Sequence, residues 1–265
     1  MNVEQLFDLS GKVVIITGAA GNLGSRYADG LSQFGANVVL ADIDEIKCKQ
    51  MAKKIKEKYL TDPEPIKLDL TKKKSISSMV SKVLKKYSKI DVLINNAAYQ
   101  GNDKIRKTSF ENLSLDDWNK SISVNLTGVF LMCQQVGKIM KKQKQGNIIN
   151  IGSTYGLVAP DQRIYGDSGQ NAAAFYSASK GGVINLTRYL ASYWNRTGIR
   201  VNTLTPGGVG NNQKSNFIKK YSNKTMLGRM AKKDEYVAAI LFLSSDASSY
   251  MTGSNLIIDG GWTAW

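Results

Sequence analysis

The chain has 265 residues, a hydrophobic fraction of 42%, a formal net charge of +15 and no histidine. This length fits one large α/β domain or two small ones, and the hydrophobic fraction argues against a disordered chain. Without histidine there is no Ser-His-Asp or Cys-His nucleophile and no histidine-ligated metal. Proton transfer near neutral pH must therefore use Tyr, Lys, a carboxylate or Cys, and we expect no metal site.

The cysteines and the N-terminus indicate a cellular setting. Cys48 and Cys133 lie far apart in helix-like stretches, which predicts buried free thiols rather than a disulfide. The N-terminal segment contains Glu4 and Asp8 and has no apolar run, so we expect no secretory signal. No apolar run approaches the roughly 18 residues of a membrane span. We expect a soluble, cytoplasmic protein with no membrane partner.

The positive charge is carried by basic residues spread along helix-like stretches, such as Lys53-Lys54 and Lys141-Lys142. We interpret them mainly as ordinary solvated helix faces. A functional basic patch for an acidic partner remains an alternative.

Short apolar runs alternate with longer helical patterns along the chain. The expected strands are Val13–Ile16, Asn37–Ala41, Pro65–Leu68, Asp91–Ile94, Asn147–Ile151, Ile199–Leu204 and Asn255–Ile258. The expected helices are Leu23–Phe34, Asp44–Tyr59, Ser75–Tyr87, Asp116–Lys142, Tyr176–Asn195 and Lys233–Ser244. Apolar strands separated by helices predict a parallel sheet of seven strands buried on both faces, in a single doubly wound α/β domain over residues 1–265.

A glycine-rich turn, Thr17-Gly18-Ala19-Ala20-Gly21-Asn22-Leu23-Gly24, joins the first expected strand to the first helix. Glycines permit a tight turn and let a pyrophosphate approach the backbone, and the helix N-terminus adds N–H groups and partial positive charge. The strand-turn-helix context favours a dinucleotide site.

Asp42 ends the second expected strand. A carboxylate there can accept hydrogen bonds from both adenosine-ribose hydroxyls and would repel a 2′-phosphate, which favours NAD over NADP. The alternative is that Asp42 caps the following helix.

From about Gly11 to Trp265, the sequence resembles the classical short-chain dehydrogenase/reductase family. Thr17, Gly18 and Gly24 match its T-G-x-x-x-G-x-G turn, with Asn22 in place of the middle glycine, and Asn tolerates left-handed backbone well. The resemblance implies a Rossmann domain that binds a nicotinamide cofactor. Further family elements are similar to Asp69-Leu70 at the adenine ring, Asn95-Asn96-Ala97-Ala98, Pro206-Gly207 beside the nicotinamide, and Asp259-Gly260-Gly261. The cofactor-binding residues so expected are Gly18, Gly21, Asn22, Leu23, Gly24, Asp42, Asp69, Leu70, Asn96, Ala97, Tyr176, Lys180, Pro206 and Gly207.

Four residue types point to the reaction. Tyr176 and Lys180 are four apart, on one face of a helix, and a nearby ammonium favours a phenolate. Ser153 follows the fifth expected strand, at the edge where ligands bind in such sheets, and Asn125 lies within the helix Asp116–Lys142. The resemblance implies that these four form the catalytic tetrad. Tyr176 would transfer the proton, Lys180 would lower the Tyr176 pKa and hold the nicotinamide ribose, Ser153 would stabilise the reacting oxygen, and Asn125 would anchor a proton-relay water.

Three segments are expected to form the substrate site: 99–109, 154–175 and 207–229, the last including a lid over Gly210–Leu227. They are polar and contain the cations Lys104, Arg106, Arg163, Lys219 and Lys220. This composition favours a hydroxylated, acidic or neutral substrate such as a sugar, nucleotide sugar or sugar acid over a steroid or fatty acyl chain. The stretch from Tyr155 to Leu190 is also similar to the flagellin modification protein A type of oxidoreductase, linked to legionaminic (sialic-acid-like) sugar pathways.

Two other functions remain open: a 3-oxoacyl-carrier-protein reductase, whose NADPH preference conflicts with Asp42, and a non-catalytic NAD-binding or nucleic-acid-binding protein. The chain has no recognised nucleic-acid motif, so we expect no nucleic-acid partner. The resemblance also implies a homodimer or homotetramer, paired through Asp116–Lys142 and Tyr176–Asn195. These two helices carry surplus apolar residues, namely Val129, Phe130, Leu131, Met132, Leu186, Tyr189, Leu190 and Trp194.

Overall fold

A computed structural model describes residues 2–265, and its central element is a parallel sheet of seven strands in the order β3-β2-β1-β4-β5-β6-β7. The strands are β1 Val13–Thr17, β2 Asn37–Asp42, β3 Glu64–Lys67, β4 Val92–Asn95, β5 Gly146–Ile151, β6 Ile199–Pro206 and β7 Asn255–Ile258. This is the predicted doubly wound Rossmann architecture, with every expected strand present.

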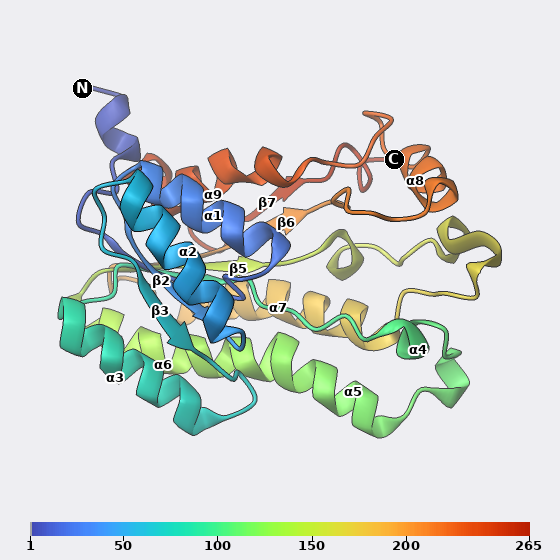
Figure 1. The fold of residues 1–265 in the computed structure, drawn as a ribbon, viewed down its shortest axis with the longest axis horizontal. Helices are drawn as coiled ribbons and strands as arrows, with labels where there is room; N and C mark the ends of the chain where they lie inside the picture. The colour runs from blue at the N-terminus through green and yellow to red at the C-terminus, as the bar shows by residue number, and fades with distance from the viewer. Residues whose placement is uncertain (1) are drawn as a thin grey trace.

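Helices cover both faces of the sheet (Figure 1). On one face lie α1 Asn22–Gln33, α2 Glu45–Lys58 and α9 Val237–Ser244; on the other lie α3 Lys73–Tyr87, α6 Gly128–Gln143 and α7 Ala174–Tyr193. Side chains alternate along each strand, so Val13 and Ile15 enter one core while Val14 and Ile16 enter the other. Burial on both faces explains the continuous apolar runs at Val13–Ile16 in β1 and at residues 92–94 in β4.

One helix start settles a question left open by the sequence. The side chain of Asp44 accepts a hydrogen bond from the backbone N–H of Lys47 at 3.1 Å and is the N-cap of α2. The interpretation of Asp42 as that cap is therefore wrong, because Asp42 lies at the end of β2.

The expected helix Asp116–Lys142 is not uniform. It consists of α5 Leu115–Ile122, a π-helical turn over Ser123–Thr127, and α6. One widened turn hardly changes the spacing of apolar residues, so the sequence predicted one regular helix. Such turns are frequent at functional sites, and this one contains Asn125. The expected helix Lys233–Ser244 likewise begins with a 3-10 turn over Lys233–Tyr236 before α9.

Two short helices escaped prediction, α4 Asp103–Arg106 and α8 Ser215–Ser222. Both lie at one end of the molecule, with the segment after β5 between them (Figure 1). The segments that form this end follow the carboxyl ends of the strands. Ligands of doubly wound sheets bind there, at the point where the strand order reverses between β1 and β4.

Both cysteines are buried free thiols, as predicted. The apolar residues of α6 and α7 that one buried helix face would not require differ in their exposure. Val129, Met132, Leu190 and Trp194 are buried, whereas Phe130 and Tyr189 are exposed. Within residues 2–265, no helix is both long and apolar enough to span a membrane, and no group of three potential His, Cys, Asp or Glu ligands is placed to hold a metal ion.

Candidate active site

Two glycines let the turn after β1 close tightly. Gly18 has a φ of +66°, and a side chain there would put its Cβ 2.7 Å from the Cα of Ala97. A Cβ on Gly24 would collide with the carbonyl oxygen of Gly18. Asn22, which stands in place of the family's middle glycine, is the first residue of α1, and its φ is not positive. Its substitution for glycine therefore adds no strain at φ.

Asn96 ties the end of β4 to this turn. Its Nδ2 donates to the carbonyl oxygens of Thr17 at 3.0 Å and Gly18 at 3.1 Å, and its backbone N–H donates to Thr17 Oγ1. Among residues 2–265, the N–H groups of Asn22 and Leu23 have no hydrogen-bond acceptor, and both residues line the large cavity described below. Free N–H groups at a helix N-terminus fit the pyrophosphate of a dinucleotide.

The carboxylate of Asp42 already has two backbone partners. Oδ2 accepts from Ala20 N and Oδ1 accepts from Asp44 N, each at 3.0 Å. A carboxylate offers about four acceptor sites, so it retains capacity for ribose hydroxyls. Asp42 thus also holds the turn in place.

Asp69 and Leu70 have structural contacts of their own. Asp69 accepts from the backbone and hydroxyl of Thr71 and pairs with Lys72 at 3.2 Å, and these partners lower its pKa. Leu70 is buried, and its Cβ would lie 2.9 Å from a Cβ on Gly128.

A cavity of about 910 Å³ lies at the carboxyl ends of the strands. The expected site residues that line it are Asn22, Leu23, Asn96, Ser153, Tyr176, Lys180, Pro206 and Gly207. The expected site residues outside its lining are Gly18, Gly21, Gly24, Asp42, Asp69, Leu70, Ala97 and Asn125. All three expected substrate segments contribute to its walls.

Ser153, Tyr176 and Lys180 meet on one wall. The ammonium of Lys180 lies 5.8 Å from the Tyr176 ring centroid and donates to the carbonyl oxygen of Ile151 at 2.6 Å. Burial lowers the pKa of Lys180 to about 8. Burial also raises the pKa of Tyr176, while hydrogen bonds with the side chains of Ser153 and Gln100 act in the opposite direction. The net direction is opposite to the lowering expected from the sequence, because desolvation of the phenolate dominates here.

Asn125 is fully buried and acts on the backbone near Tyr99. Its Oδ1 accepts from Tyr99 N at 2.6 Å, and its Nδ2 donates to Tyr99 O at 2.9 Å. Nδ2 also lies within hydrogen-bond distance of the hydroxyls of Ser121 and Ser179. The side-chain amide is thus taken up by protein partners, and it clamps the segment after β4 to α7.

A buried polar network lies behind this wall. Asn95 Nδ2 donates to Asn150 Oδ1 at 2.8 Å, and Asn150 Nδ2 donates to Thr187 Oγ1 at 2.9 Å. The hydroxyl of Thr203 continues the network to Thr187 at 2.9 Å. It joins β4, β5 and β6 to α7, and so fixes the strand that precedes Ser153 relative to the helix that carries Tyr176.

Comparison with known proteins identifies the family. Residues 18–263 match the family model described as enoyl-(acyl carrier protein) reductase. The chain is 32% identical to the post-translational flagellin modification protein A of Campylobacter coli over 254 residues, 96% of this chain and 99% of that protein. This protein belongs to the classical short-chain dehydrogenase/reductase family. It is also 37% identical to the 3-oxoacyl-[acyl-carrier-protein] reductase of Thermotoga maritima, over 96% of this chain and 98% of that one.

Solved structures of this family include complexes with both nicotinamide cofactors. A short chain dehydrogenase from Leptospira borgpetersenii with bound NAD+ has a TM-score of 0.85 and 34% identity, covering 99% of this chain and 96% of that chain. A gluconate 5-dehydrogenase from Burkholderia cenocepacia, solved with NADP and tartrate, has a TM-score of 0.89 and 29% identity, with full coverage of both chains. The short-chain dehydrogenase/reductase described here is an oxidoreductase that uses a nicotinamide dinucleotide to interconvert alcohols and carbonyls.

Sequence reasoning missed the aromatic part of this dehydrogenase's substrate cavity. The three segments were expected to be polar, but two of them, 154–175 and 207–229, also bury a cluster around Tyr165 and Tyr221, with Tyr155 and Phe217 packed on it. The ring of Tyr221 stacks on Trp262 with centroids 4.3 Å apart. Phe217 and Tyr221 are four residues apart on α8, but the other aromatic residues come from separate segments, so no local pattern shows that they all meet. Gln100, beside the phenol of Tyr176, was missed as well.

Proposed function

We propose that this chain, acting as one catalytic domain over residues 1–265, is an NAD(H)-dependent oxidoreductase for a polar, carbohydrate-type substrate such as a sugar, nucleotide sugar or sugar acid. The observation that carries the proposal is the meeting of Ser153, Tyr176 and Lys180 on one wall of a cavity with a polar rim. Aromatic faces beside amide side chains suit a substrate with both C–H faces and hydroxyl groups.

The four predicted residues have distinct roles in this proposal. Tyr176 gives its proton to a carbonyl oxygen, or takes one from an alcohol, while Ser153 donates a hydrogen bond to that oxygen and stabilises its developing charge. Lys180 supports the phenolate and holds the nicotinamide ribose. Asn125 positions these groups, and because its side-chain amide is bonded to protein partners, it would anchor the water for proton exchange through its backbone. The bound cofactor supplies or accepts the hydride.

The cofactor preference rests on Asp42. Its carboxylate would accept from the ribose hydroxyls, and it would face the added phosphate of NADP, which carries roughly −1.5 to −2 charges. We infer that Asp69 and Leu70 border the adenine, and that Gly18, Gly21, Gly24, Asn22, Leu23, Asn96, Ala97, Pro206 and Gly207 bind the rest of the cofactor.

We infer further that the enzyme is a homodimer or homotetramer. The exposed aromatic residues Phe130, Tyr189 and Tyr193 on α6 and α7 support pairing through these helices. The two buried free thiols suit a reducing compartment such as the cytoplasm.

A second candidate is a 3-oxoacyl-carrier-protein reductase. It is favoured by the 37% identity to the Thermotoga maritima enzyme and by the net charge of +15, which would attract an acidic carrier protein. The carboxylate of Asp42 argues against it, because that activity prefers NADPH.

A turnover screen separates the two candidates. Polyols, aldoses, sugar acids and nucleotide sugars are tested with NAD+ and NADP+, and a 3-oxoacyl thioester is tested with NADH and NADPH. We expect turnover of a carbohydrate with NAD+ that is lost in Tyr176→Phe. Thioester reduction with NADPH and no carbohydrate turnover would refute the proposed substrate class.

A further inference from the structure

Arg106 is one of three cations of the substrate segments that line the cavity, and unlike Lys107 and Lys214 it is not an exposed residue. It is the last residue of α4 and lines the 910 Å³ cavity. The other cations singled out from the sequence, Lys104, Arg163, Lys219 and Lys220, are not part of the lining. Arg163 is paired with Asp161 at 2.8 Å.

The backbone at Arg106 is firmly held. The preceding residue, Ile105, is 6% exposed and belongs to a core cluster with Phe175, the residue before Tyr176. The carbonyl oxygen of Arg106 accepts from Asn171 N at 2.7 Å, and Asn171 Nδ2 donates to Thr108 O at 2.8 Å. Arg106 therefore has a fixed place relative to Tyr176.

Arg106 is half-buried as a residue, and within residues 2–265 its side chain has no carboxylate within ion-pair distance. Two carboxylates line the same cavity, those of Asp103 and Asp167, and neither forms an ion pair with it. Lys107 and Lys214 also line the cavity, so its rim carries more positive than negative charge. A cation on the wall of a cavity that has no carboxylate partner in the protein is free to pair with an anion bound in that cavity.

A guanidinium fork matches the geometry of a carboxylate or a phosphate and binds it with two parallel hydrogen bonds. Amide side chains of Gln100, Gln170 and Asn171 line the same space and suit hydroxyl groups. The cavity thus offers separate places for an anion, for hydroxyls and for the oxygen that reacts at Ser153 and Tyr176.

We propose that Arg106 is the anion anchor of the substrate, which carries a carboxylate or phosphate at a position other than its reacting carbon. This inference rests on the proposed function, because it concerns a carbohydrate in the same cavity. It specifies an acidic sugar rather than a neutral polyol.

Calorimetric binding to the full-length enzyme saturated with NADH tests the anchor. The probes are D-gluconate, D-glucitol and D-glucitol 6-phosphate, which share a six-carbon polyhydroxyl chain and differ in charge. We expect the wild type to bind one of the two anions at least about tenfold more tightly than glucitol at low ionic strength. Whichever anion binds more tightly identifies the group as carboxylate or phosphate.

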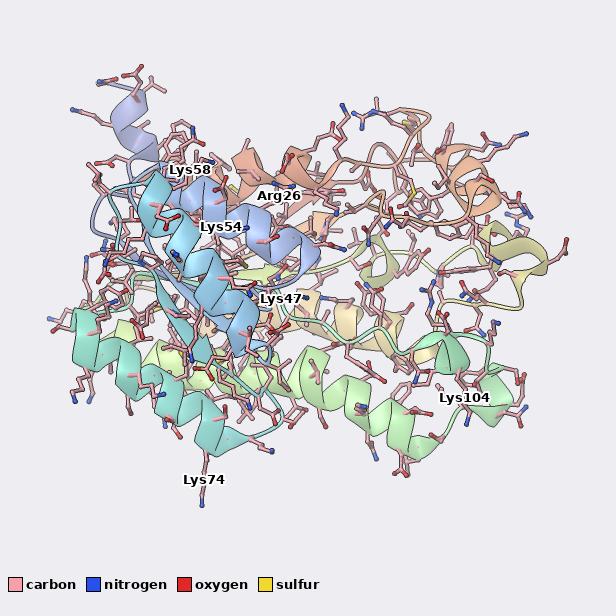
Figure 2. All side chains as sticks on the ribbon, in the orientation of Figure 1. Arg26, Lys47, Lys54, Lys58, Lys74 and Lys104 are labelled. Atoms are coloured by element: carbon pink, nitrogen blue, oxygen red, sulfur yellow. The ribbon has the colours of Figure 1, made fainter. Side chains whose placement is uncertain are left out.

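Arg106→Gln should reduce this preference to about threefold or less, and Arg106→Lys should retain part of it, because lysine keeps the charge and loses the fork. Lys104→Gln is the matched control. It removes the same charge from the same helix, at an exposed position outside the cavity lining (Figure 2), and should leave the preference intact.

Equal affinity of the wild type for neutral and anionic probes would overturn the anchor, as would an unchanged preference in Arg106→Gln or an equal loss in Lys104→Gln. Failure of the proposed function is a different result. If carbohydrates are turned over without preference for anions, the proposed function stands and Arg106 is not the anchor. If only a 3-oxoacyl thioester is turned over, the substrate class itself is wrong.

Discussion

The buried ammonium of Lys180 should cost the ligand-free enzyme stability, and replacing it by methionine should make that cost measurable. The side chain is 3% exposed, and its single hydrogen-bond acceptor is the carbonyl oxygen of Ile151. Burial lowers its pKa from 10.5 to about 8. At about 1.4 kcal/mol per pKa unit, the charged form destabilises the fold by ~3 kcal/mol relative to the neutral form.

The sign of the pH dependence follows from proton binding. Below pH 8, Lys180 is protonated in both the folded and the unfolded state, so the full cost is present. Between pH 8 and 10.5 the unfolded chain still holds the proton that the folded chain has released, so wild-type stability rises with pH. The free energy of unfolding of Lys180→Met lacks this contribution.

Urea unfolding of ligand-free wild type and Lys180→Met at pH 7 and pH 10 measures the effect. We expect the difference in unfolding free energy to shift by ~2–3 kcal/mol in favour of the wild type as pH rises, while the variant has lost turnover. Lys54→Met is the control, because Lys54 is an exposed residue of α2 (Figure 2) and its substitution should produce no such shift. A difference between wild type and Lys180→Met that stays constant with pH would show that the cavity wall solvates the ammonium well.

Four further changes test the rest of the site. Tyr176→Phe should lower kcat by about 10²–10⁴ while the cofactor Kd, measured by fluorescence titration, stays near that of the wild type. Asp42→Ala should erode a preference for NAD over NADP of tenfold to several hundredfold, estimated from roughly 1–4 kcal/mol per charge pair, and kcat/KM with both cofactors measures it. Thr187→Val leaves the Asn150 amide without its acceptor, which should cost about 1–3 kcal/mol in chemical unfolding. Tyr189→Glu places a charge on the exposed face of α7 and should yield a smaller species by light scattering; an unchanged mass would place the interface elsewhere.

The core of the fold could be predicted because it obeys local rules. Strands such as β1 and β4 are buried along their whole length, so every residue before the polar one at their end is apolar. The turn at Gly18 could be predicted for a similar reason, since its positive φ and the close approach of Ala97 leave room only for glycine. At such positions a local constraint admits only one kind of residue, so the residue in the sequence reveals the constraint.

The substrate end could not be predicted in the same way. The aromatic cluster around Tyr165 and Tyr221 joins residues 155–172, residues 217–230 and Trp262, which are distant in the sequence, and the pattern within one segment does not show which other segment it contacts. Nor could the sequence single out Arg106 from Lys104, because a helix of four residues is only about one turn long and has no amphipathic period to separate an inward from an outward side chain. That distinction comes from Ile105, whose burial against Phe175 sets the rotation of α4.

Asn125 combines a local feature that the sequence predicted with contacts between distant segments that only the structure shows. The sequence marked it as a polar residue inside an apolar helix, and the structure places it in a π-helical turn with its amide bonded to both backbone groups of Tyr99. It also lies within hydrogen-bond distance of Ser179, which donates to the carbonyl oxygen of Tyr176. A carbon side chain could not hold the backbone of one segment and the catalytic helix together, since buried backbone groups need polar partners. One amide therefore fixes the start of the segment that carries Gln100 and Arg106 against the helix that carries Tyr176 and Lys180, and so it joins the residue proposed to select the substrate to those proposed to transfer the proton.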